Sequence, residues 1–278
     1  MPHNAAPGRA LAALIALLLA LVVVPALAAR EYPIWLPLVR GPVAAPTVTT
    51  QPTAQATNRP TATSVPQPTM PAGSNPTFTG RATYYDATGA GACSFDPSPG
   101  DLNVAALNAP QFATADYCGA YVRVQGPRGS VVVRIVDLCP DAICTTGHLD
   151  LSQQAFAQIG DISQGIIPIS WQIVSPAISG PVAYHLKDGS NQWWTAVQVR
   201  NHRNPIARFE YRTSGDVWAT VPRLDYNYFV QTNPGMGPGP YTFRITDSYG
   251  NQLIDTGIVG GASVTRQGAA QFPPVAAP

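Results

Sequence analysis

The stretch that decides the fold of the first half of this chain is SVVVRIVDLCPDAICTTGHLDLSQQAFAQIG, residues 130–160. Its β-branched run ends at Asp137 and predicts a strand, which the turn GPRG (residues 126–129) joins to the strand before it as a hairpin. Further along, Ser152 occupies the N-cap position of an amphipathic helix that Gly160 ends. The stretch therefore predicts a strand, a cysteine-bearing loop and a helix, with an acidic residue at each end of the loop.

Those two acids, Asp137 and Asp150, allow two interpretations. If the loop between them is closed, both carboxylates face one groove, and two acids roughly 6.5–9.5 Å apart are what an inverting glycosidase requires. Alternatively, Asp150 only complements the positive end of the following helix, and Asp137 only accepts hydrogen bonds from loop amides. Spacing alone favours the structural interpretation. A third carboxylate, Asp86, follows the strand GRATYYD, in which Thr83 and Tyr85 share one face.

The four cysteines, Cys93, Cys118, Cys139 and Cys144, indicate two disulfides in an exported chain. Three pairings are possible, and local closure favours Cys93–Cys118 with Cys139–Cys144. The only close pair has four residues between its members, which is not the usual spacing of a zinc site. We therefore expect no metal.

The amino terminus has the three parts of a secretory signal: Arg9, then the apolar run LAALIALLLALVVV, then the small-residue sequence PALAA. The apolar run has about 14 residues, fewer than the roughly 20 that span a membrane, so cleavage is favoured over anchoring. We expect a signal peptide at residues 1–29 and, because Pro and Thr dominate the sequence that follows, an extended spacer at residues 30–77. The mature protein should be secreted, without a stable membrane span.

Charge and composition narrow the class of partner. The net charge is +1 and only 11% of residues are charged, against roughly 25% in an average domain. These values argue against nucleic acid, whose binding depends on many phosphate contacts from basic residues. The expected partner is a neutral molecule.

The folded sequence divides into two predicted domains of about 100 residues each, at residues 78–179 and 180–278. The boundary lies near Gly180, between the strands ISWQIV and VAYHLK. The second domain shows only strand patterns, including WTAVQVRN, IARFEYRT, VWATVPR, YNYFVQT and QLIDTGIV, at the spacing of a small antiparallel β-sandwich.

Adjacent Trp193 and Trp194 are the clearest binding candidates in the second domain. They would point to opposite faces of a regular strand, so either one is core or a loop exposes both. An exposed pair suits a sugar ligand, whose C–H faces stack on indole rings. Tyr226 and Lys187 are weaker candidates on their own. Trp171 and Trp218 lie within alternating strand patterns, so we expect them in the core. His148 and His202 are isolated in the sequence, so we assign them no role.

Taken together, the segments TGRATYYD, LNVAALNAPQF, CGAYVRVQGPRGSVVVRIVDLCP, GHLDLSQQAFAQIG and PISWQIV resemble the first domain of expansins, in particular bacterial expansin-like proteins. WWTAVQVRNHRNPIARFEYR and LDYNYFVQTNPG resemble their second domain. The resemblance implies a mainly β protein: a six-stranded double-psi β-barrel, related to family 45 endoglucanases, followed by an immunoglobulin-like β-sandwich that binds cellulose.

The resemblance also implies residue roles. Thr83, Asp137 and Asp150 match the polar groove residues of the barrel, and Asp150 matches the general acid of the related glycosidases. On the sandwich, three aromatic residues match a row that stacks on a glucan chain, with a lysine beside it: Trp193, Trp194, Tyr226 and Lys187. The family loosens plant cell walls without detectable hydrolysis, so the resemblance implies no cofactor. The expected state is a monomer, and the expected partners are cellulose, other β-glucans and peptidoglycan.

Two departures from the family pattern bear on function. Cys139 stands where many bacterial members have a tyrosine, which supports the Cys139–Cys144 pairing and removes an aromatic contact from the groove. Asp86 follows a segment resembling the one that carries the catalytic base in the hydrolases. Three classes therefore stay open: non-hydrolytic wall loosening, a glycoside hydrolase or lytic enzyme acting on β-glucan or peptidoglycan, and a carbohydrate-binding adhesin on a stalk.

Overall fold

The computed structural model describes residues 75–275. The predicted signal peptide and nearly all of the predicted spacer lie outside the described residues. Within residues 75–275, no helix is long and apolar enough to cross a membrane.

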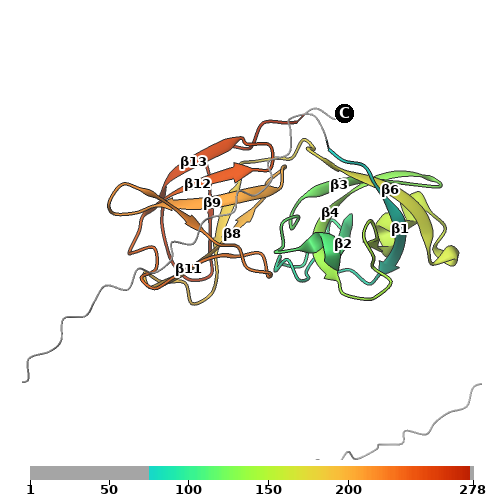
Figure 1. Ribbon diagram of the computed structural model, residues 1–278, viewed down its shortest axis with the longest axis horizontal. Coiled ribbons are helices and arrows are strands. Elements are labelled where there is room, and N and C mark those ends of the chain that lie inside the picture. Colours follow the sequence, from blue (N-terminus) through green and yellow to red (C-terminus); the bar gives the residue numbers. More distant parts are fainter. Residues whose placement is uncertain (1–74, 276–278) are drawn as a thin grey trace, which may run out of the picture. The chain divides into compact units, whose positions relative to one another are not determined.

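Six strands close into a barrel in the order β1-β5-β2-β4-β3-β6 (Figure 1). Their bounds are β1 Phe78–Tyr85, β2 Val104–Asn108, β3 Tyr121–Gly126, β4 Gly129–Cys139, β5 Leu149–Ser152 and β6 Ile167–Val174. The pairs β1–β5 and β2–β4 are parallel, and the other neighbours in the barrel are antiparallel. Because parallel neighbours need crossover connections, segments distant in sequence meet on one face of the barrel.

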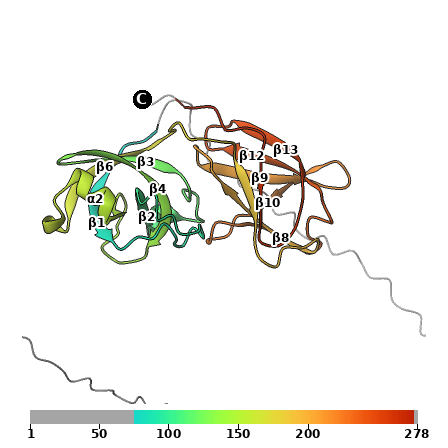
Figure 2. The ribbon, with the colours of Figure 1, turned by 180° about the vertical axis from the view of Figure 1, so that it is seen from behind.

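Local sequence explains the hairpin and the helices of the barrel. The β3–β4 hairpin turns at residues 126–129, as predicted. In helix α2 (Gln153–Ile159), the Ser152 hydroxyl accepts a hydrogen bond from the Ala155 amide at 3.0 Å, and the helix packs against β1, β4 and β5. Figure 2 shows α2 beside the barrel. Two shorter elements complete this region, α1 (Ala109–Phe112) and the 3₁₀ helix η1 (Ile162–Gln164).

The remaining strands form two four-stranded sheets. One has the order β10-β9-β12-β13 and the other β11-β8-β7-β14. Their bounds are β7 Ala183–Leu186, β8 Trp194–Arg200, β9 Ile206–Arg212, β10 Trp218–Val221, β11 Phe229–Thr232, β12 Tyr241–Asp247, β13 Gln252–Ile258 and β14 Val264–Gln267. Buried residues of both sheets share one core, in which Phe209 contacts Phe229 and Phe243. The sheets therefore pack face to face as a sandwich.

Of the two tryptophans predicted to lie in the core, Trp171 is buried and Trp218 is not. Trp171 is fully buried in the barrel and donates its indole N–H to the carbonyl of Gly147 at 2.9 Å. The prediction for Trp218 was wrong, because its ring lies on the outer face of its sheet, where the guanidinium groups of Arg244 and Arg212 pack 4.4 and 5.7 Å from the ring centroid. A strand pattern shows which residues share a face but not which face is covered.

The four cysteines form the two disulfides that local closure favoured, Cys93–Cys118 and Cys139–Cys144. The first links the segment before β2 to the turn before β3. The second closes the loop that follows β4.

Candidate functional site

Two of the predicted groove aspartates lie in one row that crosses four neighbouring strands of the barrel. Thr83 on β1 pairs with Asp150 on β5, and Ala106 on β2 pairs with Asp150 on one side and with Asp137 on β4 on the other. Residues paired across strands project to the same face of a sheet. Because neighbouring strands are about 4.8 Å apart, the Cα atoms of the two aspartates are separated by about 10 Å, with only the Ala106 methyl group between them. We call these four residues the cross-strand row.

Thr83 connects Asp150 to a buried histidine. The Thr83 hydroxyl donates to Asp150 Oδ1 at 2.6 Å, and its oxygen lies 3.0 Å from His148 Nε2. A threonine hydroxyl has a single hydrogen, so His148 must donate its Nε2–H to Thr83. The Nδ1 atom of His148 is then an unprotonated acceptor, and it is buried without a partner among the described residues. Two hydrogen bonds therefore run in one direction, with His148 donating to Thr83 and Thr83 donating to Asp150.

The surroundings of Asp150 favour its protonated form. Burial raises the pKa of Asp150, the Thr83 hydrogen bond partly offsets this, and the nearby carboxylates of Asp141 and Asp137 raise it further. A raised carboxyl pKa is what a general acid needs, and it also suits a group that exchanges hydrogen bonds with sugar hydroxyls. Burial likewise lowers the pKa of His148, so its ring is neutral at neutral pH.

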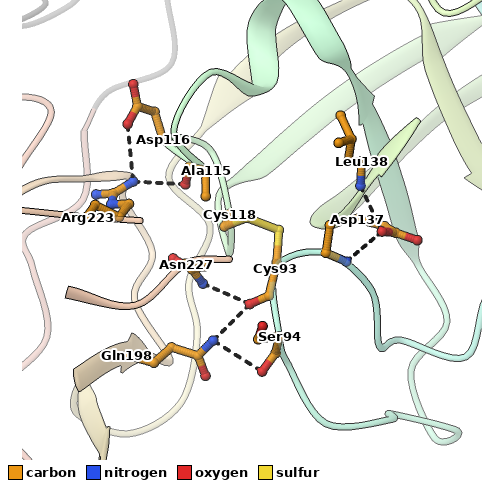
Figure 3. Close-up of a disulfide and its surroundings, with 11 residues drawn as sticks. Cys93, Ser94, Ala115, Asp116, Cys118, Asp137, Leu138, Gln198, Arg223 and Asn227 are labelled. Atoms are coloured by element: carbon orange, nitrogen blue, oxygen red, sulfur yellow. Dashed lines mark hydrogen bonds and ion pairs between the residues drawn. A yellow bond between two sulfur atoms is a disulfide. The ribbon is translucent and has the colours of Figure 1, made fainter. Parts of the chain in front are cut away.

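Asp137 has a structural task in addition to its place in the row. Its Oδ1 accepts the amide N–H of Ala92 at 2.6 Å and that of Leu138 at 2.8 Å (Figure 3). Gly91 packs directly on this carboxylate, because a Cβ at residue 91 would lie 2.3 Å from Asp137 Cγ. One oxygen of Asp137 therefore anchors the loop that carries Cys93.

Tyr85 occupies the space beside the two aspartates. It packs on Ala106 and on the disulfide Cys139–Cys144, and its buried hydroxyl has no partner among the described residues. Burial raises the pKa of the Tyr85 phenol, and the charges of Asp137 and Asp150 add to this. An aromatic side chain thus lies next to Cys139, where the resemblance predicted the loss of an aromatic contact from the groove.

Asp86 lies just beyond the end of β1 and is exposed. Its Oδ1 accepts a hydrogen bond from Gln153 Nε2, at the start of α2, at 3.2 Å. The carboxylates whose charges act on Asp150 are Asp141 and Asp137, and Asp86 is not one of them. Its role as a catalytic base stays a hypothesis from the sequence.

The two adjacent tryptophans are both accessible because Trp193 precedes strand β8 and Trp194 begins it. The Trp193 side chain is 67% exposed, and Trp194 is half-buried. The side chain of Asn191 accepts the amide N–H of Trp193 at 2.8 Å and that of Trp194 at 3.2 Å. Asn191 therefore fixes the turn that presents both rings, a role that its position in the sequence did not reveal.

Tyr226 and Lys187 lie near a further aromatic residue, Tyr228. The Tyr226 and Tyr228 ring centroids are 5.8 Å apart, and Lys187 Nζ lies 5.3 Å from the Tyr228 centroid. Tyr228 is buried with Ala196 and Val230, and both Trp194 and Tyr226 pack against this group. Trp194, Tyr226 and Tyr228 therefore lie on the outer face of the β11-β8-β7-β14 sheet, and the exposed Trp193 precedes Trp194. We call these four residues the aromatic cluster.

Hydrogen bonds join the sandwich to the barrel at Cys93. Its carbonyl oxygen accepts Gln198 Nε2 at 2.8 Å and Asn227 Nδ2 at 3.1 Å (Figure 3). Asn227 follows Tyr226 in sequence, and Ala92, which Asp137 holds, precedes Cys93. The contact at Cys93 thus ties one end of the aromatic cluster to the loop beside the cross-strand row.

A buried arginine makes a second connection. Arg223 of the sandwich donates from Nη1 to the carbonyl of Ala115 at 2.9 Å and lies 3.6 Å from Asp116 Oδ1 (Figure 3). Both partners precede Cys118, so the disulfide Cys93–Cys118 joins the two barrel segments that the sandwich contacts. We call these contacts the domain junction.

The described residues contain no group of three or more histidine, cysteine, aspartate and glutamate side chains arranged to hold a metal ion. His148, Asn191 and Tyr228 are the residues that sequence reasoning missed. A lone histidine gives no signal, and Tyr226 and Tyr228 meet in the turn before β11, where strand periodicity does not apply.

Comparison with known proteins decides the family. The chain is 39% identical over 182 residues to Expansin-YoaJ of Bacillus subtilis (strain 168), a match that covers 64% of this chain and 76% of that protein. The chain belongs to the expansin family. The crystal structure of an expansin from Clavibacter michiganensis in its apo form superposes with a TM-score of 0.65 at 37% identity, over 72% of this chain and all of that one.

Two further matches bear on the chemistry of this expansin. A point mutant of the Clavibacter michiganensis expansin, solved in complex with cellohexaose, matches at 36% identity with a TM-score of 0.65, again over 72% of this chain and 100% of that chain. The family model described as lytic transglycolase matches residues 77–171, the barrel. The six-stranded barrel is thus the double-psi β-barrel expected for an expansin.

Proposed function

We propose that this expansin is secreted, binds cellulose and related β-glucans, and weakens contacts between wall polysaccharides without hydrolysing them. The observation that carries the proposal is the unequal state of the two aspartates in the cross-strand row. Asp150 has a raised pKa and is free to bond a sugar, whereas Asp137 uses one oxygen to hold two backbone amides. A hydrolytic site of the inverting type needs a second carboxylate free to activate water.

Binding is the part of the proposal that the aromatic cluster supports. The exposed ring of Trp193 and the half-buried rings of Trp194 and Tyr226 offer flat apolar surfaces for sugar rings, and a relative of this chain has been crystallised with cellohexaose. Between the barrel and the aromatic cluster lies a cavity of about 450 Å³, lined by Ala92 and Leu138 on one side and Asp225 and Tyr226 on the other. A glucan chain could therefore contact both the cluster and the cross-strand row.

Loosening follows from competition for hydrogen bonds. Each net hydrogen bond between neighbouring chains contributes only about 1 kcal/mol, so groups that offer equivalent bonds to a docked chain can displace its neighbours without breaking a covalent bond. In the row, Thr83, Asp150 and the free oxygen of Asp137 are the groups that we propose make these bonds.

The test is sugar release measured together with binding. The disulfide-intact protein and its Asp86→Asn and Asp150→Asn variants are incubated with amorphous cellulose, mixed-linkage glucan and peptidoglycan. We expect all three proteins to release no reducing sugar, and the wild type to bind cellulose and weaken cellulose paper. Release by the wild type that both substitutions abolish would establish hydrolysis with Asp86 as base and Asp150 as acid. Tight binding with neither release nor weakening would instead indicate an adhesin.

A second candidate function is a lytic enzyme acting on peptidoglycan. Two observations favour it: the raised pKa of Asp150, and the match of the barrel to a family model described as lytic transglycolase. Cleavage in which a hydroxyl of the sugar itself attacks the anomeric carbon needs an acid but no activated water. Because such cleavage creates no reducing end, its test is the loss of turbidity of a peptidoglycan suspension, with Asp150→Asn as the control.

A further inference from the structure

A cavity of about 230 Å³ lies at the domain junction and is lined by two arginines from different domains. Arg134 of β4 contributes from the barrel, with Phe95 and Tyr121 beside it. Arg200, at the end of β8, contributes from the sandwich, with Asn201 and His202. None of these six residues belongs to the cross-strand row or to the aromatic cluster, so the proposed glucan site does not account for the cavity.

The cavity carries an excess of positive charge. Arg134 makes no ion pair among the described residues, and its guanidinium lies 5.0 Å from the centroid of the Phe95 ring. Arg200 pairs through Nη1 with Asp96 Oδ2 at 2.6 Å, but the Asp96 side chain is 76% exposed. An exposed carboxylate is largely solvated and adds little to the stability of such a pair. Arg200 Nε donates to Gln198 Oε1 at 2.5 Å, so a second carboxylate would bind the Nη atoms, where it could share or replace Asp96.

His202 gives the cavity a specific acceptor. Its side chain is 3% exposed, and Nδ1 lies 2.8 Å from the carbonyl oxygen of Asn204. A carbonyl can only accept, so Nδ1 carries the proton and Nε2 has a free lone pair. Burial lowers the pKa of His202 to about 4, which keeps the ring neutral. Nε2 lies against Gly119, where a Cβ would approach it to 2.5 Å, so a side chain at residue 119 would cover this acceptor.

We propose that the junction cavity binds a sugar that carries a carboxylate, such as one uronic acid residue of an acidic glycan. Guanidinium groups match carboxylates in geometry and charge, and the two arginines supply them from opposite walls. A neutral imidazole acceptor suits a neighbouring sugar hydroxyl, which can donate to Nε2. The volume corresponds to about eight water molecules, enough for one sugar ring or part of one.

The position of the cavity adds a mechanical consequence. A ligand held by Arg134 and Arg200 bridges the barrel and the sandwich, so binding should stabilise the domain junction against opening. No residue of the cavity belongs to the aromatic cluster, but Arg200 lies beside Tyr228 of that cluster, so the cavity adjoins the proposed cellulose surface.

The test uses the disulfide-intact protein and D-glucuronate, with glucose as the neutral match, and with chloride and inorganic phosphate at equal ionic strength. We expect glucuronate at tenfold its dissociation constant to raise the unfolding midpoint by about 4 °C, while glucose and chloride have no effect. Calorimetric titration gives the dissociation constant directly. Equal shifts from chloride and glucuronate would overturn the proposal, and tighter binding of phosphate than of glucuronate would overturn the sugar assignment.

Matched variants locate the site. Arg134→Gln should weaken glucuronate binding by at least about tenfold, because a charge-assisted hydrogen bond is lost. The control is Arg123→Gln, which removes the same charge from an exposed position on β3 and should leave binding unchanged. Cellulose pull-down by Arg134→Gln should equal that of the wild type, so failure of this proposal and failure of the proposed function are distinguishable. Unchanged glucuronate binding in folded Arg134→Gln would overturn the assignment to this cavity.

Discussion

Burial raises the pKa of Asp150 and Thr83 partly offsets this, because within residues 75–275 the Thr83 hydroxyl is the only side-chain group that donates a hydrogen bond to that carboxylate. From the sequence, only the resemblance to expansins predicted that Thr83 shares a surface with Asp137 and Asp150. The physical link is the parallel pairing of β1 with β5, which sets Thr83 beside Asp150, together with the imidazole of His148 on the other side of the hydroxyl.

Replacing Thr83 with valine, which has the same shape, should raise the pKa of Asp150 further. The lost hydrogen bond is the interaction that lowers this pKa, whereas burial and the neighbouring carboxylates continue to raise it. Carboxyl NMR titration measures the change. Thr79→Val, on the same strand and exposed, is the control and should leave the Asp150 titration unaltered. A lower Asp150 pKa in Thr83→Val would contradict the assigned direction of the hydrogen bond.

His202 should make the stability of the protein depend on pH. Its pKa is lowered from 6.5 to about 4, mainly by burial, with Arg223 and Arg134 adding to this. As pH falls from 6.5 to 4, the unfolded chain takes up a proton that the folded chain does not, so stability is lost over that range, by up to about 3 kcal/mol. Urea unfolding at several pH values measures this slope. His202→Gln should flatten it, and an equal slope in wild type and variant would refute the prediction.

At the scale of elements, capping and hairpin residues were sufficient to predict α2 and the β3–β4 turn, because both depend on contacts within a few residues. The strand β5 has four residues and no pattern of its own, and it forms because it lies between β1 and β2 in the barrel. Its place brings Asp150 opposite Ala106, so the cross-strand row depends on an element that local patterning could not predict.

In the loop before β8, the side chain of Asn191 holds the backbone that carries the two adjacent tryptophans. Asn191→Ala removes two hydrogen bonds to the amides of Trp193 and Trp194, so the loop should lose its fixed conformation and affinity for cellulose should fall about fivefold. Depletion from solution by microcrystalline cellulose measures this. The neighbouring Gln192→Ala, whose side chain makes no hydrogen bond in the structure, should bind normally. If both variants bind like the wild type, Asn191 does not position the rings.

A substitution at Gly91 tests how tightly the loop bound by Asp137 is packed. A methyl group at residue 91 would lie 2.3 Å from Asp137 Cγ, so Gly91→Ala should lower the free energy of unfolding by about 1–3 kcal/mol. Gly100→Ala, with no atom within 4 Å of the added carbon, is the control. Chemical denaturation of both variants distinguishes them. Equal stability would show that the loop can move away from Asp137 at little cost.

At the scale of the whole molecule, the disulfide Cys93–Cys118 joins the two barrel segments that the sandwich contacts. The carbonyl of Cys93 accepts hydrogen bonds from Gln198 and Asn227, and Arg223 contacts the turn before Cys118. The position of Tyr226 relative to the barrel therefore depends on a bond entirely within the barrel.

Removing this disulfide should weaken both the fold and the domain junction. For a sequence separation of 25, loop entropy predicts a loss of about 3.5 kcal/mol in the Cys93→Ser, Cys118→Ser variant, and for a separation of 5, about 2 kcal/mol in Cys139→Ser, Cys144→Ser. Scanning calorimetry should resolve separate barrel and sandwich transitions in the first variant only. A single transition in both variants would show that the junction does not depend on Cys93–Cys118.

By itself, the sequence predicted the mainly β fold, the hairpin and the helix cap and favoured the pairing of the cysteines, because each rests on alternation, capping or closure over short distances. It also supplied the residues that we propose contact sugars. Only the tertiary structure decided that Asp150 and Asp137 flank Ala106, that His148 bonds to Thr83, and that Arg134 and Arg200 share a cavity. These contacts join residues far apart in the chain, and strand register and domain packing, which no local pattern encodes, bring them together.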